Sequence, residues 1–353
     1  MKTENRVPII QDSALRTHHS VLLWGVAMKD LFSILLIIAV AVSSGTAQAQ
    51  QTAQVARIGL VIATSPTTNP ARIEAFRRGL RELGYVEGKN IVFEYRYAEG
   101  KIALLPALLD ELVRLKVDVI VAGGPSVTRA AKKTTVTIPI VMTWDYDPVG
   151  NGFVASLARP GGNITGLATL APEISGKQLE LLKEIIPKLS RVAVLGTSTT
   201  PGNAEALRAM ELAAAALKVQ LRYLEIRDRK DIETAFQAAR KGRADAVLAL
   251  ASRVLVSDRT QVAHLAVTSR LPVIYGESEH VEAGGLMTYG VSISELYGRA
   301  ATYVDKILKG AKPADLPVEQ PTKFEFIVNL KAAKQIGLTI PPNVLYRADK
   351  IIR

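Results

Sequence analysis

The sequence of 353 residues contains no cysteine. Disulfide frameworks, thiolate-ligated metal centres, thiol nucleophiles and lipid attachment through cysteine are therefore excluded. Histidine is also scarce, with four residues, and neither His264 nor His280 has a partner at the spacing of metal ligands. We therefore expect no metal and no cofactor.

The motifs of common enzymes are missing as well. The loop after the first apolar segment reads Ala63-Thr-Ser-Pro66 instead of the glycine-rich turn of a dinucleotide site, and neither a P-loop nor a Gly-x-Ser-x-Gly elbow occurs. The net charge is +11, but lysine and arginine are spread over helix faces, and no helix-turn-helix segment is recognisable before residue 55. We expect neither an enzyme nor a nucleic-acid-binding protein.

An uncharged run of twelve residues, Leu31–Val42, is too short for a bilayer span, which needs about 20 residues. Small and polar residues follow it and end in Ala47-Gln-Ala49, the pattern of a cleaved secretory signal. We expect cleavage after Ala49, translation from Met28, and a periplasmic protein. The alternative is a retained membrane anchor.

After residue 54, short apolar runs rich in β-branched residues alternate with segments of helical periodicity. This alternation predicts an α/β fold with a parallel sheet and helices on both faces. We expect strands at Val55–Ile62, Ile91–Arg96, Val117–Ala122, Ile138–Met142 and Ile164–Ala168, and helices at Ala71–Leu83, Ile102–Leu115 and Ser126–Lys133.

The same series of landmarks then recurs. Arg191–Leu195 resembles Arg57–Val61, Ala244–Ala249 resembles Val117–Ala122, and Gly284–Gly290 resembles Gly161–Gly166. Two similar Rossmann-like lobes are therefore expected, with the tail packed onto both. We assign 55–168 plus about 292–320 to the first lobe and 169–291 plus about 321–353 to the second.

Ligands of open parallel sheets bind beyond the carboxyl ends of the strands. Two facing sheets would thus form a cleft lined by the loops that follow their strands. The candidates for ligand binding in these loops are Ser65, Gly124, Ser126, Thr128, Thr143, Trp144, Asp147, Ser198, Asn203, Ser252, Tyr275 and Glu277.

Three groups among these candidates have competing interpretations. The Gly123–Ser126 turn could hold a carboxylate at a helix N-terminus, or be a structural turn capped by Ser126. Trp144 and Asp147 could stack on and pair with a ligand ammonium, or Asp147 could cap the segment after Pro148. Glu277 and Glu279 could meet a cation across the cleft, although an exposed charge run is the expected reading.

Several motifs carry a family resemblance, among them Phe76–Ile91, Ser156–Gly166, Val281–Met287 and Leu338–Pro342. They resemble the ABC transporter substrate-binding proteins of the tryptophan/tyrosine-binding-like family, over about residues 55–353. The resemblance implies a type I periplasmic-binding-protein fold, hinged lobes, a small-molecule ligand and an ABC permease and ATPase as partners.

By position, Ser65, Gly124, Ser126 and Asp147 match places where that family lines its cleft. Three loops of the second lobe depart from the family pattern: Thr197–Asn203, Ser252-Arg253 and Glu277–Glu279. We expect a monomeric importer component that captures a small polar solute, with an aromatic amino acid as one candidate. The alternative is a sensory module that reports ligand to a signalling partner.

Overall fold

The computed structural model describes residues 55–169 and 171–353. The expected signal segment, its cleavage site after Ala49 and the start at Met28 lie outside the described residues. Within the described part, no helix has the length and hydrophobicity that crossing a membrane requires. The residues from Val55 to Arg353 form one compact unit.

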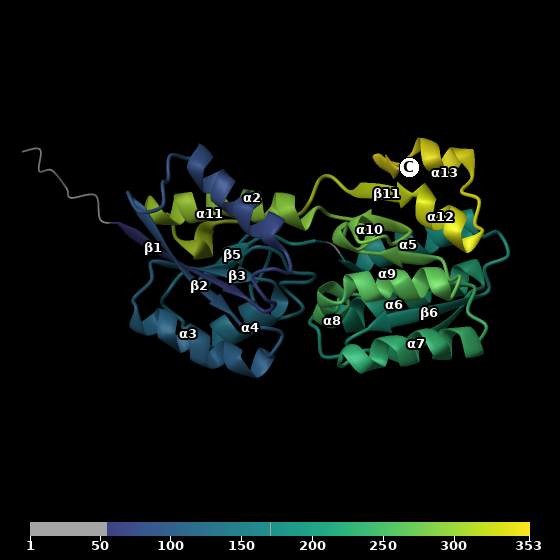
Figure 1. Ribbon diagram of the computed structural model, residues 1–353. Coiled ribbons are helices and arrows are strands. Elements are labelled where there is room, and N and C mark those ends of the chain that lie inside the picture. The colour runs from purple at the N-terminus through teal and green to yellow at the C-terminus, as the bar shows by residue number, and fades with distance from the viewer. Residues whose placement is uncertain (1–54, 170) are drawn as a thin grey trace, which may run out of the picture. The chain divides into compact units, whose positions relative to one another are not determined.

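Lobe 1 is built on a five-stranded sheet in which every pairing is parallel (Figure 1). The buried residues of its central strands are mainly valine, isoleucine and leucine, as expected for a sheet covered on both sides. In sheet order the strands are β2 (Ile91–Tyr97), β1 (Ala56–Ile62), β3 (Val119–Gly123), β4 (Ile140–Met142) and β5 (Ile164–Gly166).

Helices cover both faces of this sheet. Helices α2 (Pro70–Glu82) and α11 (Ile293–Leu308) pack together over one face, and α3 (Leu105–Arg114) and α4 (Pro125–Thr134) cover the other. The expected helix from Ile102 begins instead as a 3₁₀ turn, η1 (Ile102–Leu104). The α-helix α3 starts at Leu105, so that Pro106 lies in its first turn, where proline is tolerated.

Lobe 2 contains a seven-stranded sheet in which all pairings but one are parallel. The expected parallel sheet is confirmed, and strand β11, from the tail, is the one that runs antiparallel to its neighbour β10. The reason is the chain path, because β10 leads out to α11 in lobe 1 and β11 returns from there. In sheet order the strands are β12 (Lys350–Ile352), β11 (Glu325–Asn329), β10 (Met287–Gly290), β9 (Val273–Tyr275), β8 (Ala246–Ala249), β6 (Arg191–Gly196) and β7 (Gln220–Glu225).

Two helical layers enclose this second sheet, and each contributes one hydrophobic cluster. One layer consists of α5 (Ala171–Ile185), α6 (Asn203–Leu217), α12 (Leu330–Ile336) and α13 (Pro342–Tyr346). The other consists of α7 (Arg229–Lys241), α8 (Arg253–Ser257), α9 (Arg259–Thr268) and α10 (Glu279–Glu282).

The chain passes between the lobes three times, after β5, after β10 and before β11. Two of these crossings are hydrogen-bonded to each other: the Ala168 N–H donates to the Glu319 carbonyl at 2.9 Å, and the Glu319 N–H donates to the Gly166 carbonyl at 3.0 Å. A short 3₁₀ turn, η2 (Pro313–Asp315), precedes the last crossing. The first and last crossings thus lie side by side.

Candidate functional site

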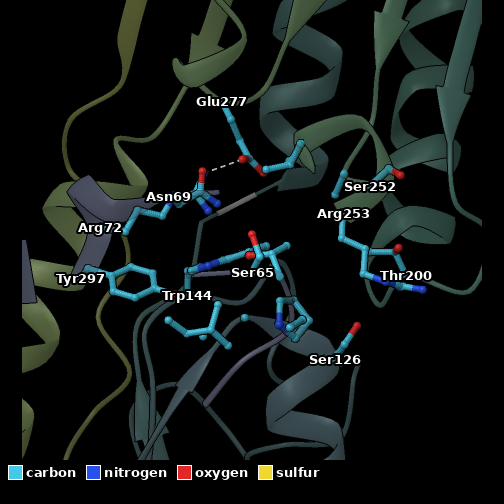
Figure 2. A pocket seen from close by; sticks show the side chains of 18 of the residues that line it. Ser65, Asn69, Arg72, Ser126, Trp144, Thr200, Ser252, Arg253, Glu277 and Tyr297 are labelled. Carbon is cyan, nitrogen blue, oxygen red and sulfur yellow. Dashed lines mark hydrogen bonds and ion pairs between the residues drawn. The ribbon is translucent and has the colours of Figure 1, made fainter. Parts of the chain in front are cut away.

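A pocket of about 740 Å³ lies between the loops at the carboxyl ends of the strands in both lobes (Figure 2). Lobe 1 contributes the segments after β1, β3 and β4, and lobe 2 those after β6, β8 and β9. A second space of about 630 Å³ adjoins it deeper in lobe 2. The two share Tyr146, Ala251, Ser252, Val256 and Glu277 in their linings.

About half of the expected binding residues come together at these pockets. The first pocket is lined by Ser65, Gly124, Ser126, Trp144, Ser252 and Glu277, and the second by Asn203 together with Ser252 and Glu277. These residues come from six separate loops. They lie close together because the carboxyl ends of parallel strands share one edge of the sheet.

The other expected residues lie elsewhere. Asp147 lines neither pocket, and its carboxylate accepts a hydrogen bond from the Gly150 N–H at 2.8 Å, so it stabilises the turn after β4. Ser198 is exposed, and its N–H donates to the Glu225 carboxylate. The remaining three, Thr128, Thr143 and Tyr275, are fully buried inside their lobes.

The glycine turn at the start of α4 takes its shape from Gly124. This residue is the N-cap, with φ +108°, so Ser126 lies within the first turn and is not the cap that one interpretation assigned to it. A Cβ at position 124 would lie 2.9 Å from Cζ2 of Trp144, so only glycine lets the indole edge reach the turn. The first turn of α4 and the Trp144 indole therefore form one wall.

A buried ion cluster joins the lobes beside the pocket. Arg72 on α2 donates from Nη2 to Oε2 of Glu277 at 2.6 Å and from Nε to Oε1 of Glu279 at 2.7 Å. The exposed fraction of the Arg72 side chain is 7%. The expectation of an exposed charge run at Glu277 and Glu279 was wrong, because an arginine about 200 positions earlier in the chain meets both carboxylates.

Charge complementarity sets the protonation of this cluster. Burial opposes the charge on Arg72, but the Glu277 and Glu279 carboxylates more than offset that effect and raise its pKa. Burial likewise opposes the charge on Glu279, and Arg72 lowers the pKa of Glu279 below its usual value. The cluster therefore pairs the Arg72 cation with the Glu279 anion, and Glu277 accepts a further hydrogen bond from Arg72.

Aromatic side chains form much of the remaining wall. The Trp144 and Tyr146 rings meet edge to face, with centroids 5.0 Å apart, and Tyr297 reaches the pocket from α11. Burial raises the pKa of both tyrosines, so their phenols remain neutral donors. Such a wall suits an apolar or aromatic ligand body.

Two polar atoms in the first pocket have no hydrogen-bond partner among the described residues: Asn69 Oδ1 and Trp144 Nε1. Both atoms are shielded from solvent. Buried polar groups normally find partners, and both atoms belong to residues that line the pocket. In the second pocket, His280 stacks on Tyr275 with ring centroids 4.6 Å apart, and burial lowers the pKa of His280.

Several lining residues are not among the expected ligand contacts, notably Asn69, Arg72 and Tyr297, while Thr200 and Arg253 lie in loops that were expected to line the cleft. Asn69 and Arg72 belong to the start of a helix with ordinary amphipathic spacing. Tyr297 belongs to a tail helix whose return to lobe 1 no local signal reveals. In the described residues, no cluster of three or more metal-ligating side chains occurs.

Two α/β lobes joined by three crossings, with a pocket at facing strand ends, define the fold of a type I periplasmic binding protein. The family model described as "ABC transporter substrate binding protein" matches residues 57–352, and the chain belongs to that family. Proteins of this family bind small molecules and are typically found outside the cytoplasmic membrane. The resemblance stated from the motifs is thus confirmed.

Three relatives illustrate the match. A tyrosine-binding protein of Clostridioides difficile is 26% identical over 77% of this chain and 78% of its own length. The crystal structure of a conserved domain protein from Vibrio cholerae is 30% identical, with a TM-score of 0.80 over 84% of this chain and all of that chain. A Streptococcus ABC domain in complex with L-Trp is 24% identical, with a TM-score of 0.76 over 84% of this chain and all of that chain.

Proposed function

We propose that this protein is the periplasmic solute-binding component of an ABC importer and captures a small polar solute between its lobes. An aromatic amino acid is the leading candidate. The observation that carries the proposal is the pocket between the lobes, which combines aromatic walls with two shielded polar atoms that lack partners. Aromatic walls with a few convergent polar groups are typical of small-molecule sites.

The relatives support the choice of ligand class. One curated relative is a tyrosine-binding protein, and one structural relative holds L-Trp. We assign ligand contact to Ser65, Ser126, Trp144, Ser252 and Glu277 among the expected residues. The positions of Asp147 and Ser198 outside the pocket linings favour structural roles for both.

The division into lobes gives the mechanism. We assign 55–168 plus about 292–320 to one moving body and 169–291 plus about 321–353 to the other, since α11 packs on lobe 1 and β11 joins the sheet of lobe 2. The paired crossings would act as the hinge, and ligand would shift the population toward the closed form. The closed form would then be presented to an ABC permease and its ATPase. The mature protein would begin after Ala49, where the signal segment is cleaved.

A thermal-shift panel tests the proposal. The purified protein is heated with each of the twenty amino acids, with arabinose and myo-inositol as neutral controls. At about 100 times its dissociation constant a ligand adds about 2.7 kcal/mol of stability, so an aromatic amino acid should raise the melting temperature by several degrees. Recovery of the amino acid unchanged would exclude turnover. Stabilisation by a sugar alone would contradict the amino-acid proposal.

A further inference from the structure

Among the described residues that line the first pocket, Arg253 is the one cation that no carboxylate neutralises. Arg72 is held by two glutamates, whereas no described residue forms an ion pair with Arg253. Within residues 55–169 and 171–353, its side chain makes a single hydrogen bond, a long one from Nε to the Gly100 carbonyl of lobe 1 at 3.4 Å. Burial lowers the pKa of Arg253, with no carboxylate to offset the effect. A half-buried guanidinium in a binding pocket without a counter-ion is costly unless the ligand supplies one.

The N-terminus of α4 adds donors on the same pocket. Helix α4 has ten residues, and Ser126 lies in its first turn. Its N-cap, Gly124, has no side chain that could accept hydrogen bonds from the first-turn N–H groups. Trp144 independently indicates a donor site here: its side chain lines the pocket and is 9% exposed, and its Nε1 has no hydrogen-bond partner in the described part of the chain. The Nε1 atom lies 3.5 Å from the Cβ position of Gly124, so this donor stands at the helix N-terminus. Donors and the positive end of the helix dipole favour an anion here.

Hydrogen-bond acceptors gather at another part of the pocket. Asn69 Oδ1 has no partner, and Glu277 lines the pocket next to Arg72. Glu277 and Glu279 place two carboxyl groups around the Arg72 guanidinium, so acceptor oxygens are concentrated on this side. Figure 2 shows Arg253 and Thr200 on one side of the cavity, with Asn69 and Arg72 on the opposite side. The pocket thus separates a donor end from an acceptor end.

Further basic side chains lie on the surface next to Arg253, outside the first pocket. A wide depression of about 1190 Å³ shares Ser65 and Arg253 with the pocket and lies between segments of both lobes. Its lining has five basic side chains, including Lys101, Arg227 and Arg259, against three acidic ones. A depression with this balance attracts anions and raises their rate of entry.

We propose that Arg253 selects ligands that carry a carboxylate, binding this group together with the N-terminal turn of α4, and that the basic depression beside it is the entrance. The inference rests on the proposed function, because it specifies how the same pocket recognises its solute. Since Arg253 belongs to lobe 2 and α4 to lobe 1, the carboxylate would contact both lobes and favour closure. The acceptor end would receive a donor group of the ligand, such as an ammonium.

The test compares acids with their amides. Calorimetric titrations use L-tyrosine, L-phenylalanine and L-tryptophan, their carboxamides, and 3-phenylpropionate with its amide. They are run on the wild type, Arg253→Met and Arg253→Lys, with Arg208→Met on the exposed face of α6 as the matched control. We expect the wild type to bind the acid about 30-fold or more tightly than the amide, in line with a charged hydrogen bond. Arg253→Met should lose that preference, and Arg253→Lys should retain part of it.

The comparison of acid and amide separates recognition from structure. If Arg253→Met weakens acid and amide equally, Arg253 has a structural role and the inference is wrong. Equal binding of acid and amide by the wild type would also overturn it. If none of these compounds binds, the aromatic proposal fails, and native mass spectrometry of the co-purified solute decides the inference: a carboxylate supports it, and a neutral solute contradicts it.

The entrance has its own readout. Raising the salt concentration, or substituting Arg227→Met and Arg259→Met together, should slow association in stopped-flow measurements about tenfold while dissociation changes little. An association rate that salt and both substitutions leave unchanged would remove the basic depression from the proposal and leave the role of Arg253 intact.

Discussion

Replacement of Arg72 with methionine should weaken ligand binding by about 100-fold or more. The substitution leaves Glu277 and Glu279 buried between the lobes without a cation, and breaking a buried ion pair in this way costs about 3–5 kcal/mol. The lobes can avoid this cost by opening, which hydrates both carboxylates. We therefore expect the effect mainly on closure and affinity, and less on the unfolding of each lobe.

Arg77 on the same helix supplies the matched control. It pairs with Glu87 at 2.8 Å, but both side chains are 40% exposed, so Arg77→Met should change affinity and stability by less than about 1 kcal/mol. The triple variant Arg72→Met, Glu277→Gln, Glu279→Gln should recover part of the closure that Arg72→Met loses. Calorimetry and small-angle scattering measure the two effects. An Arg72→Met protein with wild-type affinity and radius of gyration would show that the ion cluster does not hold the lobes together.

The second large effect is a loss of stability with rising pH, caused by Asp145. This residue follows β4, is fully buried, and its Oδ2 has no partner in the described part of the chain. Its Oδ1 accepts from the Asp147 N–H and from Asn151 Nδ2, both at 2.9 Å. Burial raises the pKa of Asp145 from 3.8 to about 7, with the two hydrogen bonds acting in the opposite direction.

The direction of the pH effect follows from linkage. Between pH 4 and 7 the unfolded chain has lost the Asp145 proton and the folded chain retains it, so this residue destabilises the fold increasingly as pH rises. At about 1.4 kcal/mol per pH unit, the free energy of unfolding of Asp145→Asn relative to wild type should rise by about 3 kcal/mol between pH 5 and pH 8. Urea unfolding at both pH values measures it.

Asp231 provides a control of opposite sign. Its carboxylate accepts from the Arg227 and Asp228 N–H groups at the start of α7, and these bonds lower the pKa of Asp231. Asp231→Asn should therefore cost stability at neutral pH, with the difference shrinking in acid. If Asp145→Asn shows the same pH dependence as the wild type, Asp145 does not retain its proton in the fold.

Much of the fold could be predicted from the sequence because the signals are local. Apolar runs such as Arg57–Val61 and their counterparts near Arg191 indicate buried parallel strands, and their repetition indicates two lobes. The antiparallel direction of β11 could not be predicted, since it depends on where the chain travels between β10 and β11. Helix α7 has clear amphipathic spacing and a capping box at Asp228, but it was not among the expected elements.

The site was harder to predict than the fold. Loops after strands identify Ser126, Trp144 and Ser252 because their position follows from topology. Arg72 and Tyr297 reach the same pocket from helix faces, where sequence spacing gives no sign of a partner more than 200 residues away. Asp147 has the chemistry of a ligand contact, yet the local turn uses its carboxylate.

Hydrogen–deuterium exchange with and without the best ligand of the amino-acid panel tests the central claim, that the solute binds between the lobes. The claim predicts slower exchange in both lobes at once: in the α4 turn and after β4 in lobe 1, and after β8 and β9 in lobe 2. Protection confined to a single lobe, or to segments that line neither pocket, would contradict it.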